Sequence, residues 1–136
     1  MRSRIGKKDS GSPSPFTHWL GCILKEVDPG KVTAELTVRK DMTNPVGKLH
    51  GGISSAVLDD IIGAAVFSLD SINFYATVNL NIDFLSSANL GDTITVTAKI
   101  IRQGRNIFNA DAYLKSADGK IIAHATSNLY KIPKSN

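Results

Sequence analysis

One long apolar segment, with strand-like segments on both sides, is the feature that most constrains the fold of this chain. Between residues 51 and 67, apolar side chains are spread round nearly the whole circumference of a helix. The only clear polar interruptions in its middle are Asp59 and Asp60. A helix of this kind has to be buried on most sides. We therefore expect the rest of the chain to wrap round it.

The segments on either side of this helix have the composition of strands. Residues 22–27 and 32–38 precede it and are joined by Asp-Pro-Gly-Lys, which is typical of a tight turn. Four more runs follow the helix, at residues 75–84, 93–102, 107–115 and 121–131. Because consecutive strands with short links are antiparallel, we predict a hairpin, one helix and a four-strand meander. The predicted class is α+β, with a sheet curled round a single buried helix.

The first 15 residues are expected to lie outside the folded domain. Four basic residues occupy the first eight positions without an acidic one, and a Ser/Pro-rich stretch follows. We predict a disordered basic tail at 1–15 and one domain at 16–133, although a short targeting or phosphate-binding role for the tail is an alternative. Without these four of the 16 basic residues, the other 12 match the 12 acidic residues. A neutral domain argues against a nucleic-acid partner.

The cysteine content and the hydropathy of the chain indicate where in the cell we expect the protein. Cys22 is the single cysteine, and no secretory signal is evident, which favours a reducing, cytoplasmic location. No apolar run is expected to reach the length of a membrane span, so we predict no membrane partner.

Residues 44–52, Asn-Pro-Val-Gly-Lys-Leu-His-Gly-Gly, lead directly into the apolar helix. Gly51 and Gly52 permit close approach of another group to the backbone, and the unpaired N–H groups of a first helical turn attract negative charge. Such N–H groups could stabilise an oxyanion that develops on a carbonyl. The alternative is that the glycines only permit a tight turn from loop to helix.

Asp59 and Asp60 lie about two turns into the helix, where an unpaired carboxylate is costly to bury. Small neighbours one turn away leave space beside either residue, so helical spacing does not separate them. One of them could be a catalytic carboxylate. The alternatives are a solvated edge or an ion pair with a neighbouring subunit.

Other polar residues permit weaker predictions. His50 precedes the helix and is expected to orient the loop by a hydrogen bond rather than to act as a base. His18 and His124 are not spaced like metal ligands with it, so no metal site is predicted. Arg102 and Arg105 flank a hairpin turn, where they could bind phosphate groups or could simply be solvated.

The ordered combination of Asn44, His50-Gly51-Gly52, Asp59 and Asn-Leu-Asn-Ile-Asp-Phe-Leu at 79–85 resembles a known family. It is similar to the phenylacetic-acid-degradation (PaaI-type) branch of the hotdog thioesterases, in the 4-hydroxybenzoyl-CoA thioesterase superfamily. The resemblance extends from about residue 16 to residue 130. It implies the hotdog fold, in which an antiparallel sheet of five to six strands wraps round one long buried helix.

The resemblance also implies roles for individual residues. Asn44 would help to hold the substrate carbonyl or the attacking water. The Gly51 N–H would polarise the thioester carbonyl, and His50 would shape the loop. Asp59, rather than Asp60, would be the general base or nucleophile. Thr77, at a position where serine is common in the family, would assist the water.

The implied substrate is an acyl-CoA with an aromatic or medium-chain acyl group, hydrolysed without a metal or a cofactor other than the coenzyme A of the substrate itself. Gly52, Arg102 and Arg105 would contact the substrate, with the arginines near the coenzyme A phosphates. The family places the helix start of one subunit opposite the aspartate of its partner. A homodimer is therefore the smallest active unit expected, and a homotetramer built as a dimer of dimers is the expected assembly.

Two alternative functions stay open from the sequence. One is a non-catalytic protein that binds or senses acyl-CoA, and the other is an acyl-thioester hydratase. The acyl group is also left open. Phe67, Leu69, Phe74 and Tyr75 could line its pocket, although their composition favours a place in the core.

Overall fold

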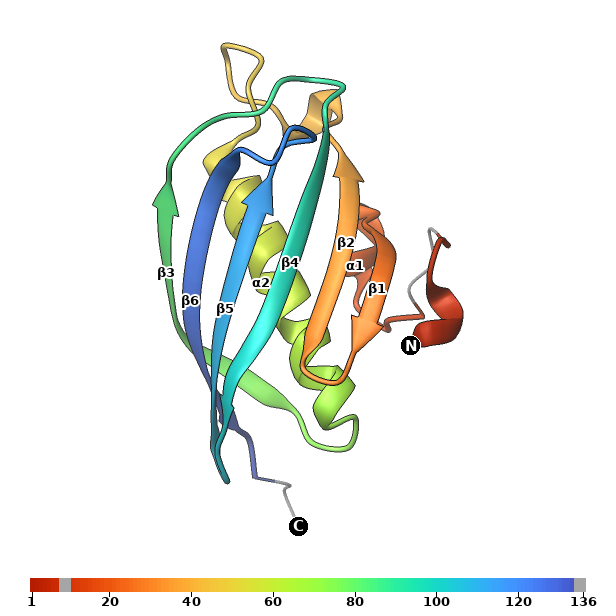
Figure 1. Ribbon diagram of the computed structural model, residues 1–136, viewed down its shortest axis with the longest axis vertical. Coiled ribbons are helices and arrows are strands. Elements are labelled where there is room, and N and C mark those ends of the chain that lie inside the picture. The colour runs from red at the N-terminus through yellow and green to blue at the C-terminus, as the bar shows by residue number, and fades with distance from the viewer. Residues whose placement is uncertain (8–10, 134–136) are drawn as a thin grey trace.

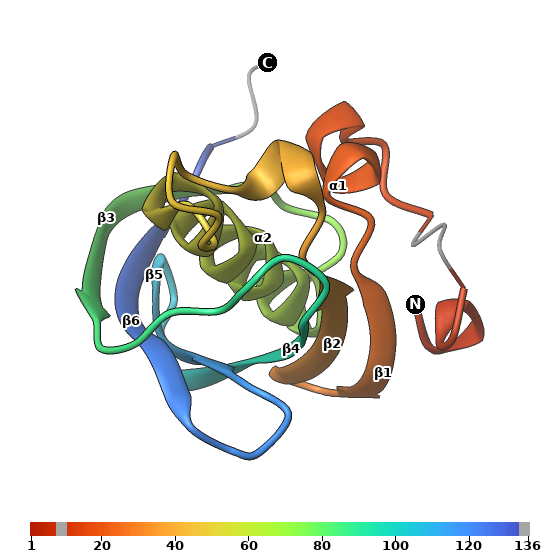
Figure 2. The same cartoon turned by 90° about the horizontal axis from the view of Figure 1, so that it is seen from above.

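A curved antiparallel sheet wraps round one long helix in the computed structural model, which describes residues 1–7 and 11–133 (Figure 1). The sheet consists of β1 (Ile23–Asp28), β2 (Lys31–Thr37), β3 (Tyr75–Phe84), β4 (Thr93–Gln103), β5 (Ile107–Lys115) and β6 (Ile121–Lys131). The helices are α1 (Pro15–Leu20) and α2 (Gly51–Leu69), and η1 (Arg2–Arg4) and η2 (Lys40–Met42) are short 3-10 turns. Figure 2 shows α2 within the concave face of the sheet. The α+β class and the sheet wrapped round one helix are confirmed.

The core lies between the inner face of the sheet and one side of α2. Along β2, β4 and β5, buried side chains alternate with more exposed ones, as the period of a strand predicts. The buried side chains of α2 are Ser54, Val57, Leu58, Ile61, Ile62, Ala65 and Val66. Each large apolar side chain removed from water stabilises the fold by roughly 1.5–3 kcal/mol. This packing fixes the orientation of α2, and with it the side chains on its other side.

One stripe of α2 faces away from the core. Gly52, Asp59, Gly63 and Phe67 are exposed along it, so the helix is less completely buried than its composition predicts. By length and composition alone, α2 could cross a membrane, so our expectation that no apolar run reaches that length is wrong. In this fold the helix is the element that the sheet surrounds.

The order of strands in the sheet is β1-β2-β4-β5-β6-β3. The predicted four-strand meander is therefore wrong for its first strand, because β3 pairs with β6 and not with β4. Residues 85–92 form the link between β3 and β4 and cross the end of the molecule where α2 begins (Figure 1). They are held there by the Leu49 N–H, which donates to Ala88 O at 2.8 Å. Because this link is longer than a tight turn, it can span the sheet from β3 to β4, and β3 is therefore an edge strand beside β6.

The two edge strands, β1 and β3, differ in what covers them. The N-terminal segment lies beside β1, where the Gly6 N–H donates to Leu24 O at 2.8 Å. No described segment lies along the outer edge of β3, a strand of ten residues. An uncovered strand of this length presents unpaired backbone N–H and C=O groups to any strand that approaches it.

Part of the predicted tail contacts the folded domain. Arg2 Nε donates to Val27 O at 2.9 Å, and its guanidinium lies 3.6 Å from the Asp28 carboxylate. Residues 8–10, in the middle of the predicted tail, lie outside the described residues. The division into a disordered tail at 1–15 and a domain at 16–133 stays a prediction.

Candidate active site

Asp59 and Thr77 meet where α2 faces β3. Asp59 projects from the exposed stripe of α2, and the Thr77 hydroxyl donates to Asp59 Oδ1 at 3.1 Å. Both residues are exposed to solvent. A carboxylate that accepts one hydrogen bond in this way still has lone pairs for a water molecule or a substrate. The structure thus brings together two of the residues that were predicted for the site.

Asp60 has a different environment, although it is the next residue in the chain. The Thr17 hydroxyl of α1 donates to Asp60 Oδ1 at 2.6 Å. Burial raises the pKa of Asp60; the Thr17 hydrogen bond opposes this rise, and the charge of Asp59 adds to it. Asp60 therefore attaches α1 to α2, whereas Asp59 is the carboxylate that faces outward.

The start of α2 presents one backbone donor. His50 is the N-cap residue, and its Nδ1 accepts the Gly52 N–H at 2.8 Å. The backbone carbonyl of His50 accepts the N–H groups of Ile53 and Ser54. Among the described residues, the Gly51 N–H has no acceptor. Gly51 therefore supplies the N–H that an oxyanion could use at this helix start.

The ring nitrogen of His50 caps the helix, and its role of orienting the loop in the site stays a prediction. Gly51 lies against the Phe84 ring: a Cβ at position 51 would be 3.4 Å from Phe84 Cε1. This distance is an ordinary van der Waals contact, so the Phe84 ring packs beside the start of α2.

Asn44 organises the loop that precedes α2. Its Oδ1 accepts the N–H groups of Val46 at 3.1 Å and Lys48 at 3.0 Å. Its backbone N–H also donates to Lys48 O at 2.7 Å. The side-chain oxygen is therefore used to hold the loop. Only the amide NH₂ of Asn44 is left for the predicted contact with a substrate carbonyl or a water.

Gly51 and Asp59 are far apart along the helix axis. A rise of 1.5 Å per residue over eight residues separates them by about 12 Å. One thioester carbonyl cannot contact both groups at hydrogen-bond distance. Within a single chain the structure therefore does not bring the predicted carbonyl-polarising group and the predicted carboxylate together.

Arg102 and Arg105 lie at the β4–β5 turn and are exposed. This turn and the start of α2 are at opposite ends of the molecule (Figure 1). Within one chain, these arginines are therefore also separated from Gly51.

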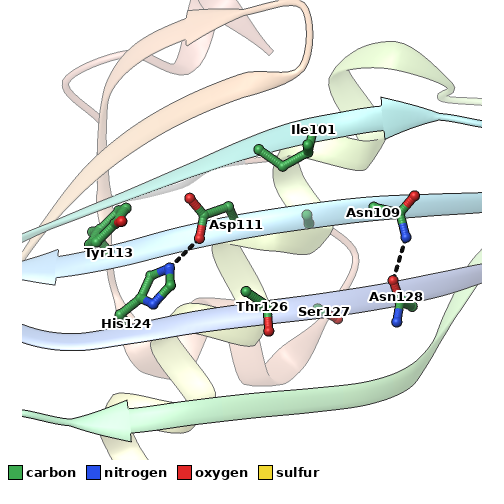
Figure 3. A pocket seen from close by; sticks show the side chains of 9 residues that line it. Ile101, Asn109, Asp111, Tyr113, His124, Thr126, Ser127 and Asn128 are labelled. Atoms are coloured by element: carbon green, nitrogen blue, oxygen red, sulfur yellow. Dashed lines mark hydrogen bonds and ion pairs between the residues drawn. The ribbon is translucent and has the colours of Figure 1, made fainter.

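A groove of about 500 Å³ lies on the outer face of β5 and β6, on the side of the sheet away from α2 (Figure 3). At one end His124 Nε2 contacts the Asp111 carboxylate, and the imidazole stacks on Tyr113. None of the predicted catalytic residues lines this groove. Among residues 1–7 and 11–133, no cluster of His, Cys, Asp and Glu could hold a metal ion.

The four residues near the end of α2 fall into two groups. Leu69 and Tyr75 pack against the core, as predicted. Phe67 and Phe74 are 52% and 72% exposed, so a place in the core is wrong for these two. Phe67 lies on the same stripe of α2 as Asp59, two turns further along the helix.

Sequence reasoning missed the residues that hold Thr77 in place. The pairing of β3 with β6 is irregular between Thr77 and Asn79, and Ser127 and Asn128 of β6 form hydrogen bonds with Asn79 at this point. The sequence carries no signal of this irregularity. Apolar residues occupy the even-numbered positions of β3 without a break, from Ala76 through Val78 to Phe84.

Comparison with known proteins identifies the family of this chain. A family model described as the thioesterase superfamily matches residues 46–123, which is more than half of the chain. Human acyl-coenzyme A thioesterase 13 is 36% identical over 110 residues, and the match covers 79% of each chain.

Two solved structures have the same fold. The zebra fish thioesterase superfamily member 2 has a TM-score of 0.82 and 27% identity, with 92% of each chain covered. The E. coli PaaI protein from the phenylacetic acid degradation operon has a TM-score of 0.84 and 24% identity, with 90% of this chain and 88% of that chain covered. The chain therefore belongs to the thioesterase superfamily and has the hotdog fold.

Proposed function

We propose that this protein hydrolyses an acyl-coenzyme A thioester to a free acid and coenzyme A, with Asp59 as its catalytic carboxylate. The observation that carries the proposal is the exposed Asp59 carboxylate, which Thr77 holds on the open side of α2. The name of the human relative supports acyl-coenzyme A as the substrate class. The reaction requires no metal or further cofactor, because water and a carboxylate are sufficient.

Asp59 could act by either of two routes. As a general base it takes a proton from water while the water oxygen attacks the thioester carbon; the C–S bond then breaks, and the proton passes to the sulfur of coenzyme A. As a nucleophile, its own oxygen attacks the thioester carbon and the C–S bond breaks, so that an anhydride forms and coenzyme A leaves as a thiolate that takes a proton from solvent; water then hydrolyses the anhydride to the free acid and the Asp59 carboxylate. In both routes Thr77 orients the carboxylate, and in the first it also helps to hold the water.

The Gly51 N–H is the proposed donor to the thioester oxygen. It points from a helix start, where backbone N–H groups stabilise negative charge that develops in the transition state. The Gly52 N–H is already bound to His50 Nδ1, so Gly52 contributes only a lack of side-chain bulk beside the substrate. Asn44 is proposed to hold the carbonyl or the water through its amide NH₂.

A second copy of the chain is proposed to complete the site. The 12 Å estimated between Gly51 and Asp59 excludes one carbonyl from reaching both in a single subunit. The outer edge of β3 offers a surface for the second copy, and Val78 and Phe84 on this strand are 64% and 57% exposed. If two β3 strands pair antiparallel about a two-fold axis, opposite ends of the subunits approach each other. Gly51 of one subunit can then face Asp59 of the other.

The same arrangement suggests where the two ends of the substrate bind. A two-fold pairing brings the β4–β5 turn of one subunit nearer to the helix start of its partner, and Arg102 and Arg105 are proposed to bind the coenzyme A phosphates there. An aromatic or medium-chain acyl group is proposed to lie along the exposed stripe of α2 between Asp59 and Phe67. A homotetramer built from two such dimers is the proposed assembly.

The test is thiol release from a panel of aromatic and straight-chain acyl-CoAs, measured with a thiol-reactive dye. The single thiol of the protein will not interfere, because Cys22 is buried and its pKa is raised to about 12 by that burial and by the charge of Asp60. Asp59→Asn is expected to lower kcat by roughly 10²–10⁴-fold. Asp60→Asn, the matched change one residue away, is expected to keep most of the activity.

Three other results would each contradict a different part of the proposed function. Normal turnover in Asp59→Asn would remove Asp59 from the mechanism. Binding of coenzyme A without thiol release from any substrate would favour the non-catalytic binding protein. Hydration of an enoyl-CoA in the same preparation would favour the hydratase.

A further inference from the structure

Strand β3 contains one residue more than its partner β6 at the level of the candidate site. Thr77 pairs with Leu129, and Leu80 pairs with Ser127. The step is three residues on β3 but two on β6, so Val78 is an inserted residue, a β-bulge. Bulges of this kind change the direction in which a side chain points.

The inserted residue decides which face of the sheet Thr77 occupies. Leu129 and Ser127 are both 3% exposed and lie on the inner face of β6. Residues directly opposite each other in an antiparallel pair lie on the same face, so Thr77 and Leu80 both point inward. In a regular strand, residues three apart point to opposite faces. Without the insertion, Thr77 would therefore point outward, away from Asp59, whenever Leu80 packs in the core.

Two side chains satisfy the backbone groups that the bulge leaves irregular. The Ser127 hydroxyl donates to the backbone carbonyl of Asn79 at 2.8 Å. The Asn79 side-chain oxygen accepts the backbone N–H of Asn128 at 3.0 Å, in the place of a ladder carbonyl. Ser127 is one of only two buried polar side chains among the described residues. An unsatisfied polar group at a buried position would be costly, so these bonds stabilise the bulge against the regular ladder.

The hydrogen bonds continue across the outer face of the sheet. Asn109 Nδ2 on β5 donates to Asn128 Oδ1, and Figure 3 shows these two side chains meeting across β5 and β6. The bulge is therefore fixed to two strands rather than to one.

We propose that Asn79 and Ser127 are positioning residues for the thioesterase reaction: they hold the bulge at Val78, and the bulge turns Thr77 toward Asp59. This inference rests on the proposed function of Asp59 and Thr77. Neither Asn79 nor Ser127 reaches the substrate, and each acts through Thr77.

The test is a double-mutant cycle on kcat. Ser127→Ala and Asn79→Leu, each made alone, are expected to lower kcat as far as Thr77→Ala does, by roughly ten- to hundredfold, with KM nearly unchanged. In a Thr77→Ala background, the same two substitutions are expected to cause no further loss, because Thr77 has nothing left to position.

Two further variants separate positioning from general stability. Asn79→Asp keeps a side-chain oxygen for the Asn128 N–H and is expected to retain most of kcat. Thr126→Val removes an exposed hydroxyl one residue from Ser127, on the opposite face of β6, and is expected to leave kcat unchanged. Thermal unfolding of every variant is measured beside the kinetics.

The outcomes distinguish this inference from the proposed function. Full kcat in Ser127→Ala and Asn79→Leu would overturn the positioning role, and so would losses that multiply with that of Thr77→Ala. Both results leave the proposed function intact if Asp59→Asn is inactive. Full activity in Asp59→Asn or in Thr77→Ala would instead contradict the proposed function, and the positioning role with it.

Discussion

Asp59 and Asp60 differ only in the elements that they face. A rotation of about 100° per residue turns Asp59 toward β3 and Asp60 toward α1. Thr77 meets the first and Thr17 meets the second. Of these two aspartates, Asp59 is thus an exposed carboxylate, whereas Asp60 is half-buried and links α2 to α1.

The raised pKa of Asp60 predicts a pH dependence of stability. Its folded-state pKa lies above the unfolded value, so its contribution to stability is fully present below the unfolded pKa and is lost as pH rises through the folded pKa. Asp60→Asn removes this titration and keeps an oxygen for Thr17. We expect the variant to become more stable relative to the wild type as pH rises from about 3.5 to 7.

The measurement is chemical denaturation at fixed protein concentration across this pH range. Thr17→Val provides the opposite change, because the Thr17 hydrogen bond lowers the pKa of Asp60. Its stability relative to the wild type should fall as pH rises. A wild type that gains stability over Asp60→Asn with rising pH would contradict this account.

The sequence could not decide between these two aspartates from periodicity. Both have small neighbours one helical turn away, and the choice depends on α1 and β3, which are distant in the chain. The resemblance to a family selected Asp59, and the structure shows that Asp59 is the exposed one of the two carboxylates. Asn44 was predicted to contact the substrate, but the use of its side-chain oxygen within its own loop could not be read from residue types.

At the scale of elements, α2 combines a packed side with an open stripe. Gly63 lies on the stripe between Asp59 and Phe67, and a Cβ built there meets no atom within 4 Å. Glycine within a helix costs about 1 kcal/mol relative to alanine. Because Gly63 has no side chain, the surface of α2 beside Asp59 stays open.

We therefore expect Gly63→Ala to fold and to raise the free energy of unfolding by about 1 kcal/mol. Gly63→Leu should fill the stripe and lower kcat/KM for phenylacetyl-CoA or decanoyl-CoA more than for acetyl-CoA. Thiol release with the three substrates, beside denaturation curves, checks both statements. An equal loss for all three substrates would contradict the proposed path of the acyl group.

The positions of the strands could be predicted closely from the sequence, but their pairing could not. Turn residues and alternation locate all the strands to within one or two residues of their observed ends. Chain order suggested that β3 pairs with β4, because most consecutive strands are neighbours. The observed crossover depends on contacts of residues 85–92 with the loop before α2, and the bulge at Val78 depends on hydrogen bonds to β6. Neither follows from local composition.

At the scale of the whole molecule, the proposed site requires two subunits. Each chain has a helix start with the Gly51 donor and, about 12 Å along the same helix, the Asp59 carboxylate. The uncovered β3 edge offers the surface on which a second copy can supply the missing partner. The assembly is then part of the catalytic mechanism.

Gly51→Pro is the variant that tests the donor most selectively. Proline lacks the N–H and is favoured at the first position of a helix, and the extended backbone of His50 is compatible with a following proline. The variant should therefore keep α2 and lose the donor to the thioester oxygen.

The most direct test of the account mixes Asp59→Asn with Gly51→Pro subunits, each inactive alone, after both are unfolded and refolded together. If the site is shared between subunits, every mixed dimer has one complete site. Thiol release should then recover to about one quarter of the wild-type rate, because half of the dimers are mixed and one site of two is intact in each. If mixing restores no activity while mixed dimers are present, the shared site is contradicted.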